Sequence, residues 1–226
     1  MIELIPKPKI KSRYSYHLTH YSFTKDYGYI SGQVPQEILN ELKETIDNLQ
    51  NNFEDGIKYN DNLVGEIEHE YETEIGDKFK NYIKHAVSEY EKRTTGKAND
   101  SKRYNLSDPW VNFQKKYEYN PLHRHEGSFS WVLWYKIPYT FNDEIKYTHK
   151  SNKDNLLHGD FTFHYPMLNE NKNDNAKIIV GCTPLKIDKS KEGMFALFPS
   201  SLHHSVNPFY STDDYRITIA GNINIK

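Results

Sequence analysis

Two stretches with helical spacing follow an N-terminal segment in which aromatic and polar residues mix without a helical period. That segment, residues 1–32, predicts extended structure or an irregular arm. A helix is predicted to begin near Pro35, because the N–H that proline lacks would be unpaired in the first turn anyway. Its apolar positions fall on one stripe. They are Val34, Ile38, Leu39, Leu42, Ile46 and Leu49.

A second helix is predicted after Asp61-Asn62, with its end at Thr94-Thr95-Gly96 and a bend at Gly76. We expect both helices to pack against one face of a sheet. The apolar stripe of the second helix comprises Ile67, Tyr71, Ile75, Phe79, Tyr82, Ile83, Ala86, Val87 and Tyr90.

From Trp110 onward the pattern is typical of short strands separated by Gly, Pro, Asn and Asp. Phe129–Ile137 is apolar on both faces, as in a strand buried between two layers. Two polar connections, residues 139–158 and 165–176, are long enough to be binding loops or surface excursions. The expected strands are Trp110–Tyr117, Phe129–Ile137, Asp160–His164, Ile178–Cys182, Met194–Phe198 and Arg216–Ile225.

Helices followed by many short strands predict a mainly β fold with α, a jelly roll flanked by N-terminal helices. We expect a single domain over residues 1–226. In it, residues 1–107 form an arm and helices that pack on the barrel, and residues 108–226 form the barrel core.

The amino-acid composition bears on nucleic-acid binding, disulfide bonds and membrane association. The 29 Lys and Arg residues nearly balance the 31 Asp and Glu residues, and no basic stripe argues for duplex DNA as a partner. The single cysteine, Cys182, excludes an intramolecular disulfide. The sequence shows neither the apolar core of a signal peptide nor a run of about 18 apolar residues. We therefore expect a soluble protein of a reducing compartment, with no membrane partner.

Two pairs of histidines are the first candidate metal ligands. On a strand, His123 and His125 would lie on the same face, and neutral imidazole is a preferred ligand of iron, zinc, copper and nickel. Further along, His203 and His204 face opposite ways, so one of them at most can join the first two. Each pair alone also fits loop or surface histidines with structural roles.

Arg216 and Thr218 share one face of the last predicted strand. A buried arginine needs an anionic partner, because an unpaired charge is costly at low dielectric. A ligand carboxylate could bind the guanidinium through two hydrogen bonds, with Thr218 adding a third. A salt bridge to Asp213, Asp214 or Glu192 is the structural alternative.

In their order and spacing these motifs resemble the iron(II)- and 2-oxoglutarate-dependent oxygenase superfamily. The resemblance covers roughly residues 108–224 and is strongest to oxygenases of marine phages and bacteria that are similar to prolyl hydroxylases. The segments that carry it are Trp110–Asn112, Asn120–His125, Gly193–Ser200, His204 and Arg216–Asn222.

The resemblance implies a double-stranded β-helix that holds one ferrous ion, with His123 as the first ligand and His204 as the distal one. Arg216 would bind the far carboxylate of 2-oxoglutarate, with Thr218 beside it. Three further residues would line the cosubstrate pocket, namely Asn112, Tyr117 and Ser130. The implied enzyme is a dioxygenase that uses Fe(II), 2-oxoglutarate and O2 to hydroxylate a C–H bond, in the cytoplasm of a bacterium or a phage-infected bacterium.

One position departs from the usual ligand set of His-x-Asp/Glu followed by a distal His. Here His125 stands where the carboxylate is expected. The subfamily that the chain resembles also shows His-x-His, which predicts a site of three histidines. Asp160 or Glu126 could instead supply an oxygen ligand, with His125 contacting a metal ligand and not the metal itself.

Two other readings of the same pattern make different predictions. A cupin-like metalloprotein would share the barrel and the three histidines without needing 2-oxoglutarate. A non-catalytic jelly-roll module, for binding or structure, would hold no metal. For the oxygenase, a protein side chain or a small metabolite is favoured as substrate over duplex nucleic acid, and the sequence indicates no oligomeric state.

Overall fold

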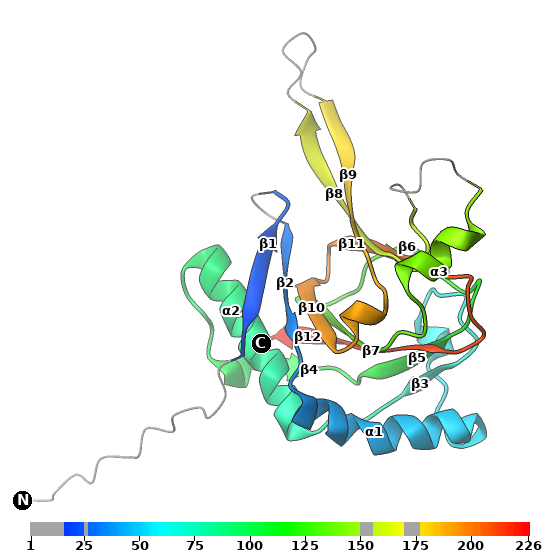
Figure 1. Ribbon diagram of the computed structural model, residues 1–226. Coiled ribbons are helices and arrows are strands. Elements are labelled where there is room, and N and C mark those ends of the chain that lie inside the picture. The colour runs from blue at the N-terminus through cyan, green and yellow to red at the C-terminus, as the bar shows by residue number, and fades with distance from the viewer. Residues whose placement is uncertain (1–15, 25–26, 150–155, 170–176) are drawn as a thin grey trace, which may run out of the picture.

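The computed structural model describes residues 16–24, 27–149, 156–169 and 177–226. It contains two sheets whose neighbouring strands all pair antiparallel, and Figure 1 shows them arranged as the two layers of a β-sandwich. The larger sheet runs in the order β1-β2-β10-β7-β12-β5-β3, with β4 paired to β12. The smaller sheet runs β6-β11-β8-β9. The predicted mainly β fold, a jelly roll with N-terminal helices, is confirmed.

The bounds of the elements are as follows. The larger sheet comprises β1 (Leu18–Ser22), β2 (Gly28–Gln33), β3 (Glu70–Glu72), β4 (Tyr104–Leu106), β5 (Trp110–Gln114), β7 (Phe129–Lys136), β10 (Met194–Pro199) and β12 (Arg216–Ile225). The smaller sheet comprises β6 (Asn120–His123), β8 (Phe161–Asn169), β9 (Lys177–Leu185) and β11 (His203–Val206). The α-helices are α1 (Gln36–Asn51), α2 (Asp77–Thr95) and α3 (Phe141–Glu144).

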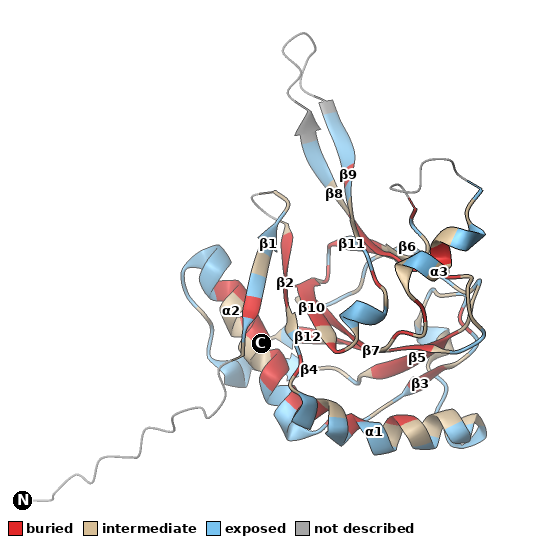
Figure 2. Ribbon diagram, viewed as in Figure 1, coloured by how far each residue is buried: buried red, intermediate tan, exposed pale blue. Residues whose placement is uncertain are grey.

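The larger sheet is buried on both faces, as Figure 2 shows for its central strands. Alternate residues of β7 point to opposite sides. Trp131 and Leu133 belong to a core shared with α1 and α2, whereas Val132 and Trp134 belong to a second core between the two sheets. This double burial explains why β7 is apolar along most of its length. The expected packing of both helices against one face of a sheet is confirmed.

The first predicted helix is confirmed and the second is corrected. Helix α1 follows Pro35, which is its N-cap residue. Helix α2 ends as predicted, with Gly96 in the left-handed conformation at φ 79°. It begins at Asp77 and not after residue 62, so Gly76 is its N-cap and not a bend. Tyr71, predicted on the helical stripe, lies in β3 opposite Val111.

The predicted strands are all present, with changes at their ends. Strand β12 has the predicted bounds, and β5 ends at Gln114, before the predicted Tyr117. The predicted connection over residues 165–176 starts too early, because β8 continues to Asn169, but its predicted end agrees with the start of β9 at Lys177. Strand β11 pairs with β8 only as far as His164, so the outer part of the β8–β9 hairpin is two-stranded and projects from the barrel in Figure 1.

The N-terminal segment is extended where the structure describes it. Strands β1 and β2 form a hairpin in register from Leu18 opposite Gly32 to Ser22 opposite Gly28. Residues 1–15 of the predicted arm lie outside the described residues. Among the helices of the described ranges, none combines the length and the apolar character that crossing a bilayer requires.

Candidate active site

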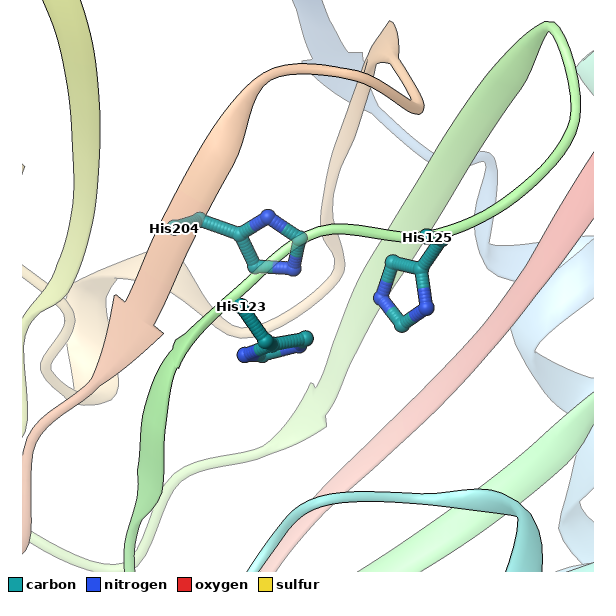
Figure 3. A group of neighbouring side chains, drawn as sticks. All are labelled: His123, His125 and His204. Atoms are coloured by element: carbon teal, nitrogen blue, oxygen red, sulfur yellow. The ribbon is translucent and has the colours of Figure 1, made fainter.

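Three histidines from two neighbouring strand segments meet between the sheets. His123 ends β6 and His125 follows it, while His204 on β11 is the cross-strand partner of His123. One ring nitrogen from each lies within 4.8 Å of those of the other two. Figure 3 shows the three side chains turned toward a common point. In the described part of the chain, this is the one group of three or more His, Cys, Asp or Glu side chains with such spacing.

Backbone carbonyls fix the tautomer of two of these rings. Nδ1 of His123 lies 2.7 Å from the carbonyl oxygen of Pro121, and Nδ1 of His204 lies 3.0 Å from that of Leu202. A carbonyl can only accept, so Nδ1 carries the proton in each ring. Nε2 is therefore left with a free lone pair, the form in which imidazole binds a metal.

Burial keeps all three rings neutral. It is the largest cause of the lowered pKa of His123 and lowers the pKa of His125 to about 4. The pKa of His204, which is 3 % exposed, falls well below the ordinary value, again because of burial and then because of the other two histidines. Neutral rings near one point are the donor set expected of a transition-metal site, so the residues fit a ferrous ion.

The two carboxylates considered as alternative ligands lie elsewhere. Asp160 accepts a hydrogen bond from Nζ of Lys186 at 2.9 Å, and burial raises its pKa to about 6 while Lys186 opposes that shift. Glu126 is exposed. The structure gathers His125, and neither carboxylate, with His123 and His204.

Arg216 is 1 % exposed and is surrounded by neutral acceptors. Its guanidinium donates to Oε1 of Gln114, to the hydroxyl of Tyr139 and to the backbone carbonyls of Gly159 and Asn207. Among the described residues, no carboxylate forms an ion pair with it. A buried positive charge with no carboxylate bonded to it is the feature expected of an anion-binding site.

The salt bridges considered for Arg216 are not formed. Asp213 pairs with Lys116 at 2.8 Å, and Glu192 accepts a hydrogen bond from the backbone N–H of Ile137. Asp214 is exposed, in the bend that precedes β12.

The remaining predicted pocket residues divide into two groups. Asn112 and Thr218 lie directly opposite each other on β5 and β12, and Nδ2 of Asn112 donates to Oγ1 of Thr218 at 3.1 Å. Tyr117 is a correction, since it lies in the turn after β5 with φ 72° and is 60 % exposed. Ser130 is buried, but it bonds to Ser200 and Asn222, away from the cavity.

A cavity of about 120 Å³ connects these groups. His123 and His125 lie on its wall together with Arg216 and Thr218 from β12. Gln114 and the segment 62–64 are among the contributors that were not predicted from the sequence. Gln114 could have been found, because it lies two residues from Asn112 on the same strand face. The segment 62–64, which also lines the cavity, carries no signal of its own and falls within the helix predicted after Asn62.

Glu70 is a further buried acid next to this wall. It lies on β3 opposite Asn112, is 0 % exposed, and its Oε1 has no hydrogen-bond partner among the described residues. Burial, and then the charge of Glu118, raise its pKa from 4.5 to about 8. The folded protein therefore keeps a proton on Glu70 that the unfolded chain releases.

We expect Glu70→Gln to change the pH dependence of stability. The folded state of the wild type binds more protons than the unfolded state between about pH 4.5 and 8, so its free energy of unfolding falls as pH rises through that interval. The slope for one proton approaches about 1.4 kcal/mol per pH unit. The variant lacks this decline, so its stability relative to wild type rises up to about pH 8. Urea denaturation from pH 5 to 9 measures it, with Glu72→Gln, exposed on the same strand, as control. Parallel curves for Glu70→Gln and wild type would contradict the assignment.

Comparison with known proteins gives a family match. A family model with the description "Putative 2OG-Fe(II) oxygenase" matches residues 108–222, which is just over half of the chain and contains all three histidines and Arg216. No curated protein matches the sequence.

Solved structures match at low sequence identity. AviO1 from Streptomyces viridochromogenes Tue57 is 11% identical with a TM-score of 0.50, and the match covers 88% of this chain and 90% of that one. A Pseudomonas putida prolyl-4-hydroxylase is 10% identical with a TM-score of 0.48, covering 88% and 94%. An oxidoreductase of the 2OG-Fe(II) oxygenase family from Burkholderia pseudomallei is 12% identical with a TM-score of 0.43, covering 86% and 84%. The match to AviO1 supports the fold.

Proposed function

We propose, since this chain belongs to the 2OG-Fe(II) oxygenase family, that it is a hydroxylase whose iron ligands are His123, His125 and His204. The observation that carries the proposal is one cavity bordered by histidines of this group and by Arg216, a buried cation with no carboxylate partner among the described residues. The family uses Fe(II), 2-oxoglutarate and O2. An anionic cosubstrate reaching from the histidines to the guanidinium would supply the missing negative charge.

Each residue has a defined task in this proposal. The carbonyls of Pro121 and Leu202 orient the rings of His123 and His204 through Nδ1 and leave Nε2 of each ring free, so that it would be available to a metal ion. Arg216 binds the far carboxylate of 2-oxoglutarate, and Thr218 lies beside it on the same strand face. A ferrous ion held by these histidines would supply the redox chemistry that couples the oxidative decarboxylation of 2-oxoglutarate by O2, to succinate and carbon dioxide, to hydroxylation of a substrate C–H bond.

Apolar side chains form part of the cavity wall. Trp134 and Phe161 contribute to its wall from opposite sheets and belong to the core between them. Trp110 closes another side, with its ring centroid 5.7 Å from that of His125. An apolar wall strengthens the attraction between Arg216 and a carboxylate, because fewer water molecules screen the charges.

The size of the cavity bears on the substrate. Its volume of about 120 Å³ is well below the roughly 300–1,000 Å³ of pockets that hold drug-sized ligands. With the cosubstrate in place, only a small projecting group of the substrate could enter. This favours a protein side chain or a small metabolite over a base held in duplex nucleic acid.

The test is anaerobic titration followed by exposure to O2. We expect Fe(II) and 2-oxoglutarate together to give a visible charge-transfer band that neither gives alone, and succinate to form once O2 is admitted. A metal-bound protein that gives no band and no succinate would instead fit a cupin-like metalloprotein. Failure to bind metal at all would favour a non-catalytic jelly-roll module.

A further inference from the structure

Gln114 and Arg216 both line the cavity and are hydrogen-bonded to each other. The two residues are direct cross-strand partners on β5 and β12. Oε1 of Gln114 accepts from Nε of Arg216 at 3.1 Å and from Nη2 at 2.5 Å. One amide oxygen therefore takes two donors from one side of the guanidinium, the arrangement in which arginine also binds a carboxylate.

A hydrogen bond to Glu118 fixes the orientation of the Gln114 side-chain amide. Nε2 of Gln114 donates to the backbone carbonyl of Glu118 at 2.6 Å, so the oxygen and not the nitrogen faces Arg216. The carboxylate of Glu118 in turn accepts from the backbone N–H groups of Lys115 and Glu68. Gln114 is 3 % exposed. The turn that follows β5 therefore holds the amide oxygen of Gln114 toward Arg216.

Arg216 has no donor left for a ligand in this arrangement. An arginine side chain has five N–H groups, and five hydrogen bonds are formed. Besides the two to Gln114, Nη1 donates to the hydroxyl of Tyr139 and the carbonyl of Gly159, and Nη2 to the carbonyl of Asn207. Any carboxylate that binds Arg216 must displace one of these acceptors. Of the four acceptor residues, Gln114 is the one on the cavity wall.

We propose that the amide oxygen of Gln114 occupies the position of the cosubstrate's far carboxylate on Arg216 until 2-oxoglutarate displaces it. This inference rests on the proposed function. The exchange replaces a neutral acceptor by a charged one, and hydrogen bonds to charged groups are the stronger kind. A ligand with a neutral group at that end would gain little over the amide, so Gln114 acts as a specificity-determining residue for a dicarboxylate.

Two substitutions of Gln114 should change 2-oxoglutarate affinity in opposite directions. Gln114→Met keeps the length of the side chain and removes the amide, so Nε and Nη2 lose an acceptor that the cosubstrate must otherwise displace. We expect the Kd to fall about tenfold. Gln114→Glu places a carboxylate on Arg216 permanently, and we expect the Kd to rise more than about 100-fold.

The measurement is calorimetric titration of Mn(II)-loaded full-length protein with 2-oxoglutarate, and then with 2-oxobutyrate, which lacks the far carboxylate. Gln114→Met should tighten binding of the first ligand and leave that of the second unchanged. Gln36→Met, exposed on α1, is the matched control and should behave as wild type. These titrations need no turnover.

The outcomes separate the two proposals. If the wild type does not bind 2-oxoglutarate, the proposed function fails and this inference fails with it. If the wild type binds but Gln114→Met binds equally or more weakly, the inference alone is overturned, because Gln114 then only positions Arg216. If Gln114→Glu does not fold, the 2-oxoglutarate affinity of Gln114→Met is sufficient to test the inference.

Discussion

We expect the replacement of His204 by alanine to abolish tight iron binding, and the replacement of its neighbour His203 to leave iron binding intact. The two residues are consecutive on β11 and differ in the face they occupy. His204 is buried against His123, with ring centroids 4.2 Å apart, while His203 is exposed opposite His164. Loss of a residue that only supports a ligand typically costs 10–100-fold in metal affinity. Loss of the ligand itself should exceed about 100-fold.

Anaerobic equilibrium dialysis with Fe(II) measures this difference directly. His203→Ala is the matched control, because it removes the same side chain from the same strand. A cooperative thermal transition of each apo variant shows that the fold is retained. Wild-type iron affinity in His204→Ala, or its loss in His203→Ala, would remove β11 from the metal site as described.

The same assay decides the third ligand. His125→Ala should lose iron affinity to a similar extent, because the ring of His125 lies 5.0 Å from that of His123 and 5.1 Å from that of His204. Asp160→Asn should not, because Asp160 bonds to Lys186. The opposite result would identify a carboxylate ligand in place of a three-histidine site.

The sequence pattern predicted the positions of the strands more accurately than the residue at which helix α2 begins. In β12 polar and apolar residues alternate, except at Ala220-Gly221, after a bend that contains two Asp residues, and its bounds were predicted correctly. In the segment 63–76 the apolar residues happen to recur at helical spacing, although Tyr71 packs as a strand residue against β5. Periodicity over so short a segment does not distinguish the two, because pairing with a distant strand overrides local preference.

The candidate site was predictable where a short motif carries the chemistry. His123, His125, His204, Arg216 and Thr218 were all identified as candidates in this way. Partners created by pairing between distant strands were missed. Gln114 and Tyr139 matter because the fold places them against Arg216, 102 and 77 residues away in the chain. The local sequence could place Gln114 on the strand face of Asn112, but it does not indicate the contact of either residue with Arg216.

Arg216→Met should weaken 2-oxoglutarate binding and leave metal binding unchanged. Methionine keeps much of the length and apolar stem of arginine but removes the charge and all five donors. Loss of one partner of a buried, hydrogen-bonded charge pair costs about 2–5 kcal/mol, or roughly 30-fold to several thousand-fold in Kd. Titration of anaerobic Fe(II)-loaded protein, followed by the charge-transfer band, measures the change. Lys116→Met, a lysine whose partner Asp213 is exposed, is the control for the loss of a positive charge elsewhere.

A comparison of two ligands tests whether Arg216 acts on the far carboxylate. Wild type should bind 2-oxoglutarate much more tightly than 2-oxobutyrate, because only the former can reach the guanidinium with a second carboxylate. In Arg216→Met that preference should nearly vanish, and affinity for 2-oxobutyrate should stay close to wild type. If the variant kept the preference, the far carboxylate would bind elsewhere. Arg124, the other arginine that lines the cavity, would then be the candidate anion site, because Asn112 and Thr218 offer only neutral groups.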